Sequence, residues 1–423
     1  MSLMKPTGFL FAMAAMAVTF MPSGMADEVT DWNQVFLDAA LTANTPPYVA
    51  PRFAAIVESA VFDAVNGIER RFTPFHVAAN GPPGASPRAA AVQAAYETLV
   101  SLYPNQKSTF DAKLVQSLAG IASASAAEHS MSIARGIEWG HTVAQSILAW
   151  RATDGANAQF PPFLGGTAPG EWRPTPPAFL PGVGFAVAHT TPWVISSASQ
   201  FRPGPPPDLT SNLYAANLNE TKDKGLKTSA TRTADETVAA TFWASASVTY
   251  LWNHVAVQLG LQRKLSLLDN ARLLAQLNVV TADAAIATFD AKYTYAFWRP
   301  VTAIPLADTD GNPATTADPA WVPLIVTPAH PEYPSAHSTF SSSAAAVLAN
   351  YFGEYTTSVF DSNTLPGVMR TFSTFSDVLA DIANARIDGG IHYRNSCNIG
   401  EALGTSVAQY SMEHSFQPVR GSH

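Results

Sequence analysis

Apolar residues recur at three- and four-residue steps through much of this chain, which is the pattern of amphipathic helices. One such stretch begins at Pro51 and carries its apolar face at Phe53, Val57, Ala60, Ala64 and Ile68. A second is predicted from the Ser86-Pro87 cap to Tyr103, just before Pro104, and a third from Ala126 to Thr153. The first part of the chain is therefore predicted to be helical.

The same pattern returns after residue 231. Thr233 and Glu236 form a capping box that predicts a helix through Val255. Ser266 is expected to start a helix with an apolar stripe at Leu273, Leu274, Leu277 and Val280, and Thr281 marks the point where an interruption is expected. Further helices are predicted at Ser341–Phe352, Met369–Asp388 and Ile399–Met412.

Between these parts, residues 154–208 lack helical periodicity and contain the proline runs 161–162, 176–177 and 205–207. The aromatic residues in this stretch favour a loop wrapped onto the body over a disordered linker. The chain is thus divided into a helical region at 27–153, a Pro-rich crossover at 154–231 and a second helical bundle at 232–423 that carries the candidate site.

Composition narrows the class of protein. The 423 residues are 47% hydrophobic and 13% charged, with a net charge of −8, which argues against a nucleic-acid partner. A single cysteine, Cys397, excludes an intrachain disulfide and a Cys-rich metal site.

Residues 1–26 have the pattern of a secretory signal peptide. Lys5 precedes an apolar run from Phe9 to Met21, and Gly24-Met25-Ala26 fits a small-x-small cleavage site. No later apolar run approaches the roughly 18 to 20 residues that a membrane span requires. We expect an exported protein, periplasmic or secreted, with no membrane span in its mature chain.

The candidate chemistry centres on Pro334-Ser335-Ala336-His337-Ser338, just before a predicted helix. A helix start directs backbone N–H groups and a positive dipole end at one point, which favours an anion. Ser335 can donate to an anion oxygen, the small Ala336 lets the backbone approach, and His337 can exchange protons.

Two further segments supply charge. Lys292 and Arg299 are seven residues apart, so on a continuous helix both would leave on one side. Arg386 and His392 flank Gly389-Gly390, whose backbone freedom can turn His392 back toward Arg386. Together these cations predict a cage for a tetrahedral or trigonal-bipyramidal oxyanion.

The pattern Lys-x6-Arg-Pro, Pro-Ser-small-His and Arg-x5-His resembles the signature of the vanadium-dependent haloperoxidase and type 2 phosphatidic acid phosphatase superfamily. Further segments resemble its bacterial haloperoxidase-like branch: Phe242-Trp243, 278–284, 298–304, 310–312 and 390–393. The resemblance implies an all-α fold of helical bundles joined by a long crossover.

The resemblance also implies roles. Vanadate would be the cofactor, His392 its ligand, and His337 the acid–base catalyst. Lys292, Arg299, Ser335, Ala336 and Arg386 would complete the cofactor-binding site. The substrates would be hydrogen peroxide, a halide and a small organic acceptor. Relatives that oxidise bromide tend to carry histidine at the position of His330, which favours bromide or iodide over chloride.

Two positions depart from the superfamily pattern. Ala336 stands where glycine is usual, and Ser396 stands where phosphatase-type motifs often have an acidic residue. The second departure counts against nucleophilic phosphatase chemistry more than against vanadate ligation. Two alternatives stay open. The first is a secreted acid phosphatase that forms a phosphohistidine at His392, with phosphate as substrate or product and no cofactor. The second is an oxyanion-binding protein without catalysis, against which the presence of His337 argues.

Overall fold

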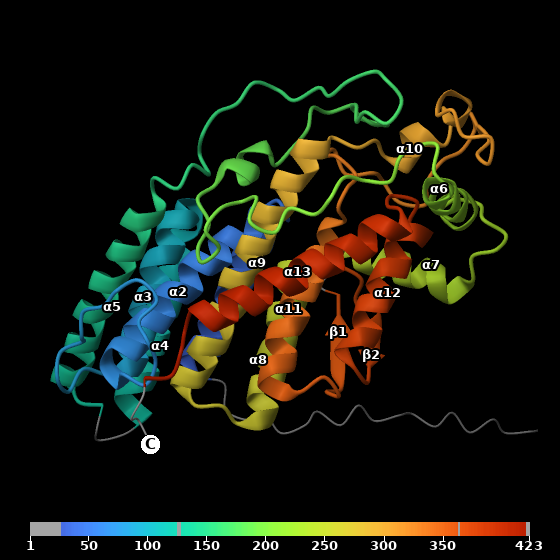
Figure 1. Ribbon diagram of the computed structural model, residues 1–423. Coiled ribbons are helices and arrows are strands. Elements are labelled where there is room, and N and C mark those ends of the chain that lie inside the picture. Colours follow the sequence, from blue (N-terminus) through green and yellow to red (C-terminus); the bar gives the residue numbers. More distant parts are fainter. Residues whose placement is uncertain (1–26, 125–127, 363, 420–423) are drawn as a thin grey trace, which may run out of the picture.

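The computed structural model describes residues 27–124, 128–362 and 364–419, and helices dominate it, so the predicted all-α class is confirmed (Figure 1). The first helices are α1 (Glu28–Thr42), α2 (Ala50–Glu69), α3 (Pro87–Leu102), α4 (Lys107–Ala124) and α5 (Ser130–Arg151). Later helices are α6 (Asn212–Lys224), α7 (Ala234–Ser245), α8 (Val248–Arg263), α9 (Leu267–Tyr295), α10 (Pro300–Ala303), α11 (Ala336–Phe352), α12 (Phe375–Asp388) and α13 (Arg394–His414). Short 3-10 helices lie at Pro104–Gln106, Phe185–His189 and Ala307–Thr309. Strands β1 (Ser358–Asp361) and β2 (Met369–Phe372) pair antiparallel.

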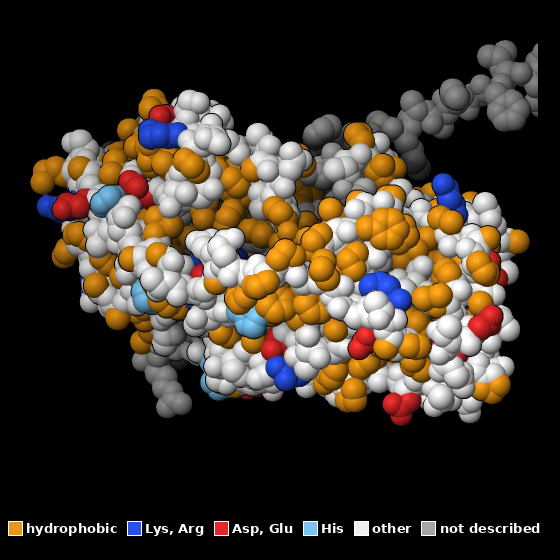
Figure 2. Space-filling view, turned by 90° about the horizontal axis from the view of Figure 1, so that it is seen from above, with side chains coloured by type: hydrophobic (Ala, Val, Ile, Leu, Met, Phe, Trp, Pro, Cys, Tyr) orange, Lys and Arg blue, Asp and Glu red, His pale blue; other side chains and the backbone are white. Residues whose placement is uncertain are grey.

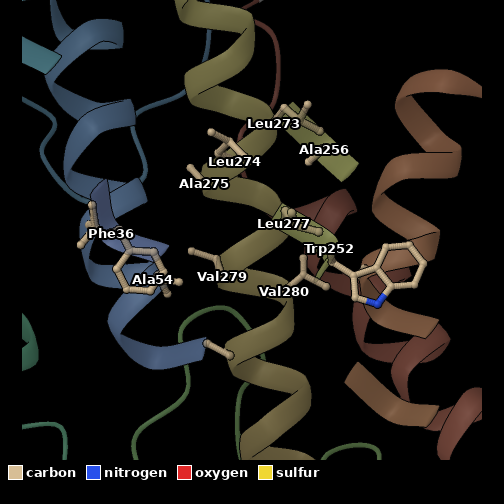
Figure 3. Close-up of a cluster of buried hydrophobic side chains, with 14 of the residues drawn as sticks. Phe36, Ala54, Trp252, Ala256, Leu273, Leu274, Ala275, Leu277, Val279 and Val280 are labelled. Carbon is tan, nitrogen blue, oxygen red and sulfur yellow. The ribbon is translucent and has the colours of Figure 1, made fainter. Parts of the chain in front are cut away.

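Helix α9 is the central helix of the fold. It lies between the N-terminal helices and α8, α11 and α13 (Figure 1). Apolar side chains leave it in opposite directions, with Val279 toward Ala54 of α2 and Val280 toward Trp252 of α8 (Figure 3). A helix that is apolar all round must be buried on all sides. One continuous hydrophobic core therefore joins the regions 27–153 and 232–423.

Several predicted helix ends are confirmed. The Ser86 side chain caps α3 by accepting from the Ala89 N–H. Thr233 and Glu236 form the reciprocal capping box of α7. Side-chain oxygens at these positions satisfy N–H groups that have no acceptor within the helix, which is why such short local signals are reliable. Helices α1 and α4 were not predicted.

Other predictions require correction. The helix expected from Thr233 to Val255 is divided, because α7 ends at Ser245 and α8 begins at Val248 after two extended residues. The interruption expected near Thr281 is absent, since that hydroxyl donates to the Leu277 carbonyl inside a continuous α9. The helix expected from Met369 begins only at Phe375, because residues 369–372 pair with β1.

The third predicted helix, Ala126–Thr153, corresponds to α5, and residues 125–127 lie outside the described residues. Residues 154–231 cross from α5 to α7 (Figure 1). Trp172 and Trp193 of this segment are buried, whereas Phe179 is 62% exposed. The segment also contains α6, which the sequence reading had left without a helix.

The surface carries few charges for its size. On the face in Figure 2, hydrophobic and neutral side chains are widespread and charged ones are scattered. Within the described residues, no helix is both long and apolar enough to cross a membrane. The predicted signal peptide at residues 1–26 lies outside the described residues.

Candidate active site

The segment 334–338, the anion loop, forms the start of α11. This helix begins at Ala336, five residues before the predicted start at Ser341, and Ser335 is its N-cap. The Ser335 Oγ accepts from the Ser338 N–H at 3.4 Å. Ala336 has helical backbone angles rather than a positive φ, so its methyl group causes no strain. His337 therefore lies in the first turn of the helix.

Lys292 and Arg299 both hold the loop that leads to α11. In the last turn of α9, the Lys292 Nζ donates to the carbonyls of Pro331 and Glu332 at 2.8 and 2.9 Å. Arg299 donates to the carbonyls of His330 at 2.9 Å and Ile391 at 2.7 Å.

The predicted reason for this pairing was wrong. Helix α9 ends at Tyr295, followed by Ala296 in the left-handed region, and Arg299 is the extended N-cap of α10. The two cations thus meet across a chain reversal, not along one helix face.

Arg386 and His392 are also brought to this loop. Arg386 lies in the last turn of α12, and Gly390, with φ +74°, reverses the chain before His392, as the glycine pair predicted. The Arg386 guanidinium is buried, and among the described residues its one hydrogen bond runs from Nη2 to the Ala240 carbonyl at 3.4 Å. Its Nε has no partner among the described residues. A buried charge with unused donors calls for an acceptor from outside the chain.

Glu332 is a site residue that sequence reasoning missed. Its Oε1 lies 2.8 Å from the His392 Nδ1 and accepts from the Tyr393 N–H at 3.1 Å. Its Oε2 accepts from the Ser396 hydroxyl at 2.6 Å. Ser396 is the position where an acidic residue was expected, so the carboxylate comes from another segment and Ser396 binds it.

This arrangement fixes the His392 tautomer. The Nδ1 carries the proton that is donated to Glu332, so the Nε2 carries the lone pair. That Nε2 lies 3.2 Å from the Arg299 Nη1. Burial and the charges of Arg299 and Lys292 lower the pKa of His392 well below its ordinary value, so the ring is neutral. A neutral imidazole nitrogen among cations can ligate a metal oxyanion or attack a phosphoryl group.

The cage holds more positive than negative charge. Burial lowers the pKa values of Arg299 and Arg386 to about 10, so both stay charged at neutral pH. Burial and neighbouring Arg299 lower the pKa of Lys292 well below its ordinary value, and an anion beside it would favour its charged form. Glu332 supplies one opposing carboxylate. The unused Arg386 donor, the unprotonated His392 Nε2 beside Arg299 and the Ser335 hydroxyl fit a bound vanadate.

His330 lies against the cage rather than at its centre. Its Nδ1 is 3.0 Å from the Arg299 Nη2 and 3.1 Å from the Pro331 carbonyl, and its ring meets Phe289 edge-on. A guanidinium can only donate, so the Nδ1 accepts from Arg299 when the ring proton is on Nε2; with the proton on Nδ1 it would donate to the Pro331 carbonyl instead. Burial and the charges of Lys292 and Arg299 keep the pKa of His330 well below its ordinary value.

His337 connects the cage to an open cavity. It is half-buried, and it lines a cavity of about 360 Å³ together with α1, the α1–α2 loop and the α7–α8 junction. The backbone of Trp243, in the last turn of α7, hydrogen-bonds to its ring. Burial and the Arg386 charge lower its pKa well below the ordinary value, so its ring is neutral and can accept a proton.

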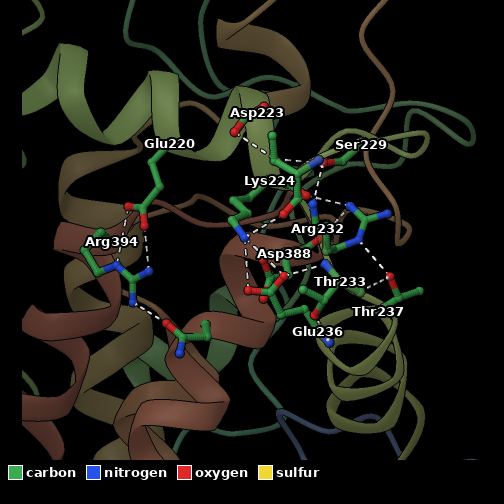
Figure 4. A network of polar contacts seen from close by, with 12 residues as sticks. Glu220, Asp223, Lys224, Ser229, Arg232, Thr233, Glu236, Thr237, Asp388 and Arg394 are labelled. Atoms are coloured by element: carbon green, nitrogen blue, oxygen red, sulfur yellow. Dashed lines mark hydrogen bonds and ion pairs between the residues drawn. The ribbon is translucent and has the colours of Figure 1, made fainter.

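A polar network holds the surrounding helices in place (Figure 4). Arg394, two residues after His392, pairs with Glu220 of α6 at 2.6 Å. Arg232 donates to the Asp388 carbonyl at the end of α12. These contacts hold α6 and the segment before α7 against the turn at Gly389-Gly390. They therefore support the positions of Arg386 and His392.

Comparison with known proteins agrees with this geometry. Residues 272–421 match the family model described as the VCPO second helical-bundle domain. A solved bacterial vanadium-dependent iodoperoxidase superimposes with a TM-score of 0.80 over 93% of this chain and 98% of that one, at 24% identity. This chain has the vanadium haloperoxidase fold. The resemblance inferred from the signature motifs is thereby confirmed.

Two further relatives support the same assignment. The structure of an apo-type bacterial vanadium-dependent chloroperoxidase superimposes with a TM-score of 0.69 at 17% identity, covering 87% of this chain and 93% of that one. The vanadium chloroperoxidase of Curvularia inaequalis is 32% identical over 94 residues, which are 20% of this chain and 15% of that protein. The chain therefore spans a small part of that curated relative's length in sequence, whereas the fold matches along nearly all of this chain.

Proposed function

We propose that this protein is a vanadate-dependent haloperoxidase. The supporting observation is the unprotonated Nε2 of His392, which faces Arg299 while Glu332 holds the other ring nitrogen, inside a buried cluster with excess positive charge. In the proposed reaction, a halide ion, hydrogen peroxide and a proton give hypohalous acid and water. The halide loses two electrons, which the peroxide O–O bond accepts.

The site residues would have different roles in this reaction. The His392 Nε2 would be the ligand of vanadate, and Lys292, Arg299, Arg386 and Ser335 would neutralise and orient its oxygens. Vanadate, when bound, supplies the Lewis-acidic centre that activates peroxide. The neutral His337 ring would accept a proton from hydrogen peroxide and return it to the water that leaves.

The direct test uses protein freed of bound anions. Addition of orthovanadate should generate peroxide-dependent halide oxidation, and phosphate should compete with it. His392→Ala should lose tight vanadate retention but keep weak, salt-sensitive anion binding through Lys292, Arg299 and Arg386. If that variant retained near-normal vanadate affinity, His392 would not be the ligand.

A secreted acid phosphatase is the second candidate, and Glu332 favours it. A carboxylate on Nδ1 would orient His392 as a nucleophile and compensate for Ser396. In this case, a phosphomonoester would be hydrolysed without vanadate, and vanadate would inhibit. The apolar cavity beside His337 weighs against it, because no Lys or Arg among its lining residues would meet a charged phosphoester.

For the halide, we propose bromide or iodide. His330 is neutral, buried and bonded to Arg299, so the polar imidazole is part of the cage wall. A wall of this kind disfavours the dry, apolar surroundings that the harder oxidation of chloride would need. Equal chloride and bromide turnover in the unmodified protein would refute this preference.

We also propose export, with cleavage after Ala26. Asp27 would then be the first residue, and its side chain caps α1 by accepting from the Thr30 N–H at 2.9 Å and receives a hydrogen bond from Asn270 at 2.8 Å. The mature chain would thus begin with a residue that is already part of the fold. N-terminal sequencing of protein recovered from the periplasm or medium tests this.

A further inference from the structure

The break between α7 and α8 builds one wall of the cavity that His337 lines. The cavity has a volume of about 360 Å³, which is at the lower end of the range for small-ligand sites. The wall from α1 and the loop after it is mainly apolar, with Phe36, Leu37, Leu41 and Pro46, and it also includes Asn44 and Thr45. No Lys, Arg, Asp or Glu is among the lining residues. The cavity therefore suits a neutral, mainly apolar molecule.

The same break leaves a group of hydrogen-bond donors without acceptors. Ser247 is the N-cap of α8, yet its side chain makes no capping bond. Its buried Oγ has no partner among the described residues, and the same holds for the Oγ1 of Thr249, a residue only 4% exposed. The first N–H groups of a helix have no acceptor within it. Both hydroxyls belong to residues that line the cavity.

These donors predict one polar feature in the ligand. A buried hydroxyl without a partner destabilises the fold, so two such groups beside the first amides of α8 indicate an acceptor supplied from outside. A carbonyl, enol or phenol oxygen would fill this role, and the helix dipole would stabilise partial negative charge on it. The apolar walls would then hold the ring.

We propose that this cavity binds the organic acceptor, a neutral ring compound with one carbonyl, enol or phenol oxygen held by Ser247, Thr249 and the α8 amides. The proposal rests on the proposed haloperoxidase function. The electron pair of a ring carbon attacks the halogen of hypohalous acid, and the halogen–oxygen bond breaks. The leaving hydroxide takes the proton from that carbon, which gives a carbon–halogen bond and water. Halogenation then occurs beside His337 rather than in bulk solvent.

A binding experiment tests the cavity independently of catalysis. Calorimetry on anion-free protein should detect 2-naphthol more strongly than 2-methylnaphthalene, which lacks the oxygen. Thr249→Val should weaken 2-naphthol binding by roughly three- to tenfold, the scale of one hydrogen bond. The matched control Thr241→Val, on the exposed face of α7, should bind like the unmodified protein. Equal binding of both compounds, or no effect of Thr249→Val, would overturn the proposal.

A product experiment tests where halogenation occurs. With bromide and peroxide, the protein is given 2-naphthol together with the hydrophilic 4-(2-hydroxyethyl)phenol. The ratio of brominated products is compared with that from reagent hypobromite. We expect the enzyme to favour 2-naphthol and Ala244→Trp, which fills the cavity from an exposed position, to shift the ratio to the reagent value.

The two experiments separate the two proposals. A reagent-like ratio from the unmodified protein would show that hypohalous acid escapes, and would overturn the acceptor site while leaving halide oxidation intact. Absence of halide oxidation would refute the proposed function, and calorimetry would still decide whether the cavity binds the ring compound. Binding that persists in Ala244→Trp would place the ligand elsewhere and overturn the proposal.

Discussion

Glu58 and Glu332 are both buried, but their surroundings differ. Glu58, on α2, accepts a hydrogen bond from the Asn33 Nδ2 at 2.9 Å, and its Oε2 has no partner among the described residues. Glu332 faces His392, Tyr393 and Ser396, with the charges of Arg299 and Lys292 nearby.

A neutral amide contacts the Glu58 carboxyl, whereas charged groups lie around the Glu332 carboxyl. Burial raises the pKa of Glu58 to about 7, so this carboxyl is largely protonated below neutral pH. For Glu332, burial raises the pKa, whereas the Ser396 hydrogen bond and the Arg299 and Lys292 charges oppose that shift. Burial of a titratable group alone therefore does not mark a site. An excess of buried cations with unused donors does, because such a cluster is complete only when an anion is bound.

The largest expected effect is the loss of turnover on removal of His337, which tests whether the cage is catalytic and the buried Glu58 is not. His337→Ala should retain vanadate but lose turnover by roughly 10²–10⁴-fold, the scale of a lost general acid–base. Steady-state kinetics with a metal assay of bound vanadium measures both quantities. Glu58→Gln is the control and should keep normal turnover, because Glu58 bonds to Asn33, which in turn bonds to Asn253, and not to any residue of the cage. Normal turnover by His337→Ala would refute the assigned role.

Glu58 should control stability instead. Its carboxyl ionises near 4.5 when unfolded but near 7 in the fold, so the free energy of unfolding should fall as pH rises between these values. Glu58→Gln removes this loss, and relative to the unmodified protein it should gain up to about 3 kcal/mol across that window. Urea unfolding at several pH values measures the slope, which does not depend on any constant effect of the new amide. Parallel pH profiles would show that Glu58 is ionised in the folded protein.

Glu332→Gln tests whether the charged carboxyl, unlike that of Glu58, supports vanadate binding. The amide cannot hold the His392 Nδ1 proton as the carboxylate does, so vanadate affinity should fall by about 10–100-fold, as for other groups that orient a metal-binding histidine. Vanadate titration of the activity measures this. Ser396→Ala removes only one hydrogen bond to the same carboxylate and should have a smaller effect in the same direction. Unchanged affinity in Glu332→Gln would mean that the His392 tautomer is fixed by other contacts.

His330→Phe should produce the smallest effect. It would make the wall apolar but remove the acceptor beside the Arg299 Nη2. We expect a several-fold rise in the ratio of chloride to bromide turnover. His330→Asn keeps a polar side chain and should leave that ratio low, so the pair separates apolarity from the lost hydrogen bond. Halogenation of an activated diketone with each halide gives the ratios.

The sequence by itself determined the helix caps and the cage residues that lie within short segments. Ser86, Thr233 and Ser335 act on N–H groups three residues away, so their effect can be read locally. The resemblance carried by the three signature segments identified Lys292, Arg299, His337, Arg386 and His392, and the structure brings them around one loop.

Tertiary structure alone decided the partners. Glu332 is 60 residues from His392, and no local pattern connects them. The reversal after Tyr295 that places Arg299, and the break after Ser245 that opens the cavity, also escaped the sequence reading. Local signals report hydrogen bonds that a segment can make with itself. Which carboxylate meets which histidine, and where a helix breaks, depend on how distant segments pack around α9, because only the packed core fixes those distances.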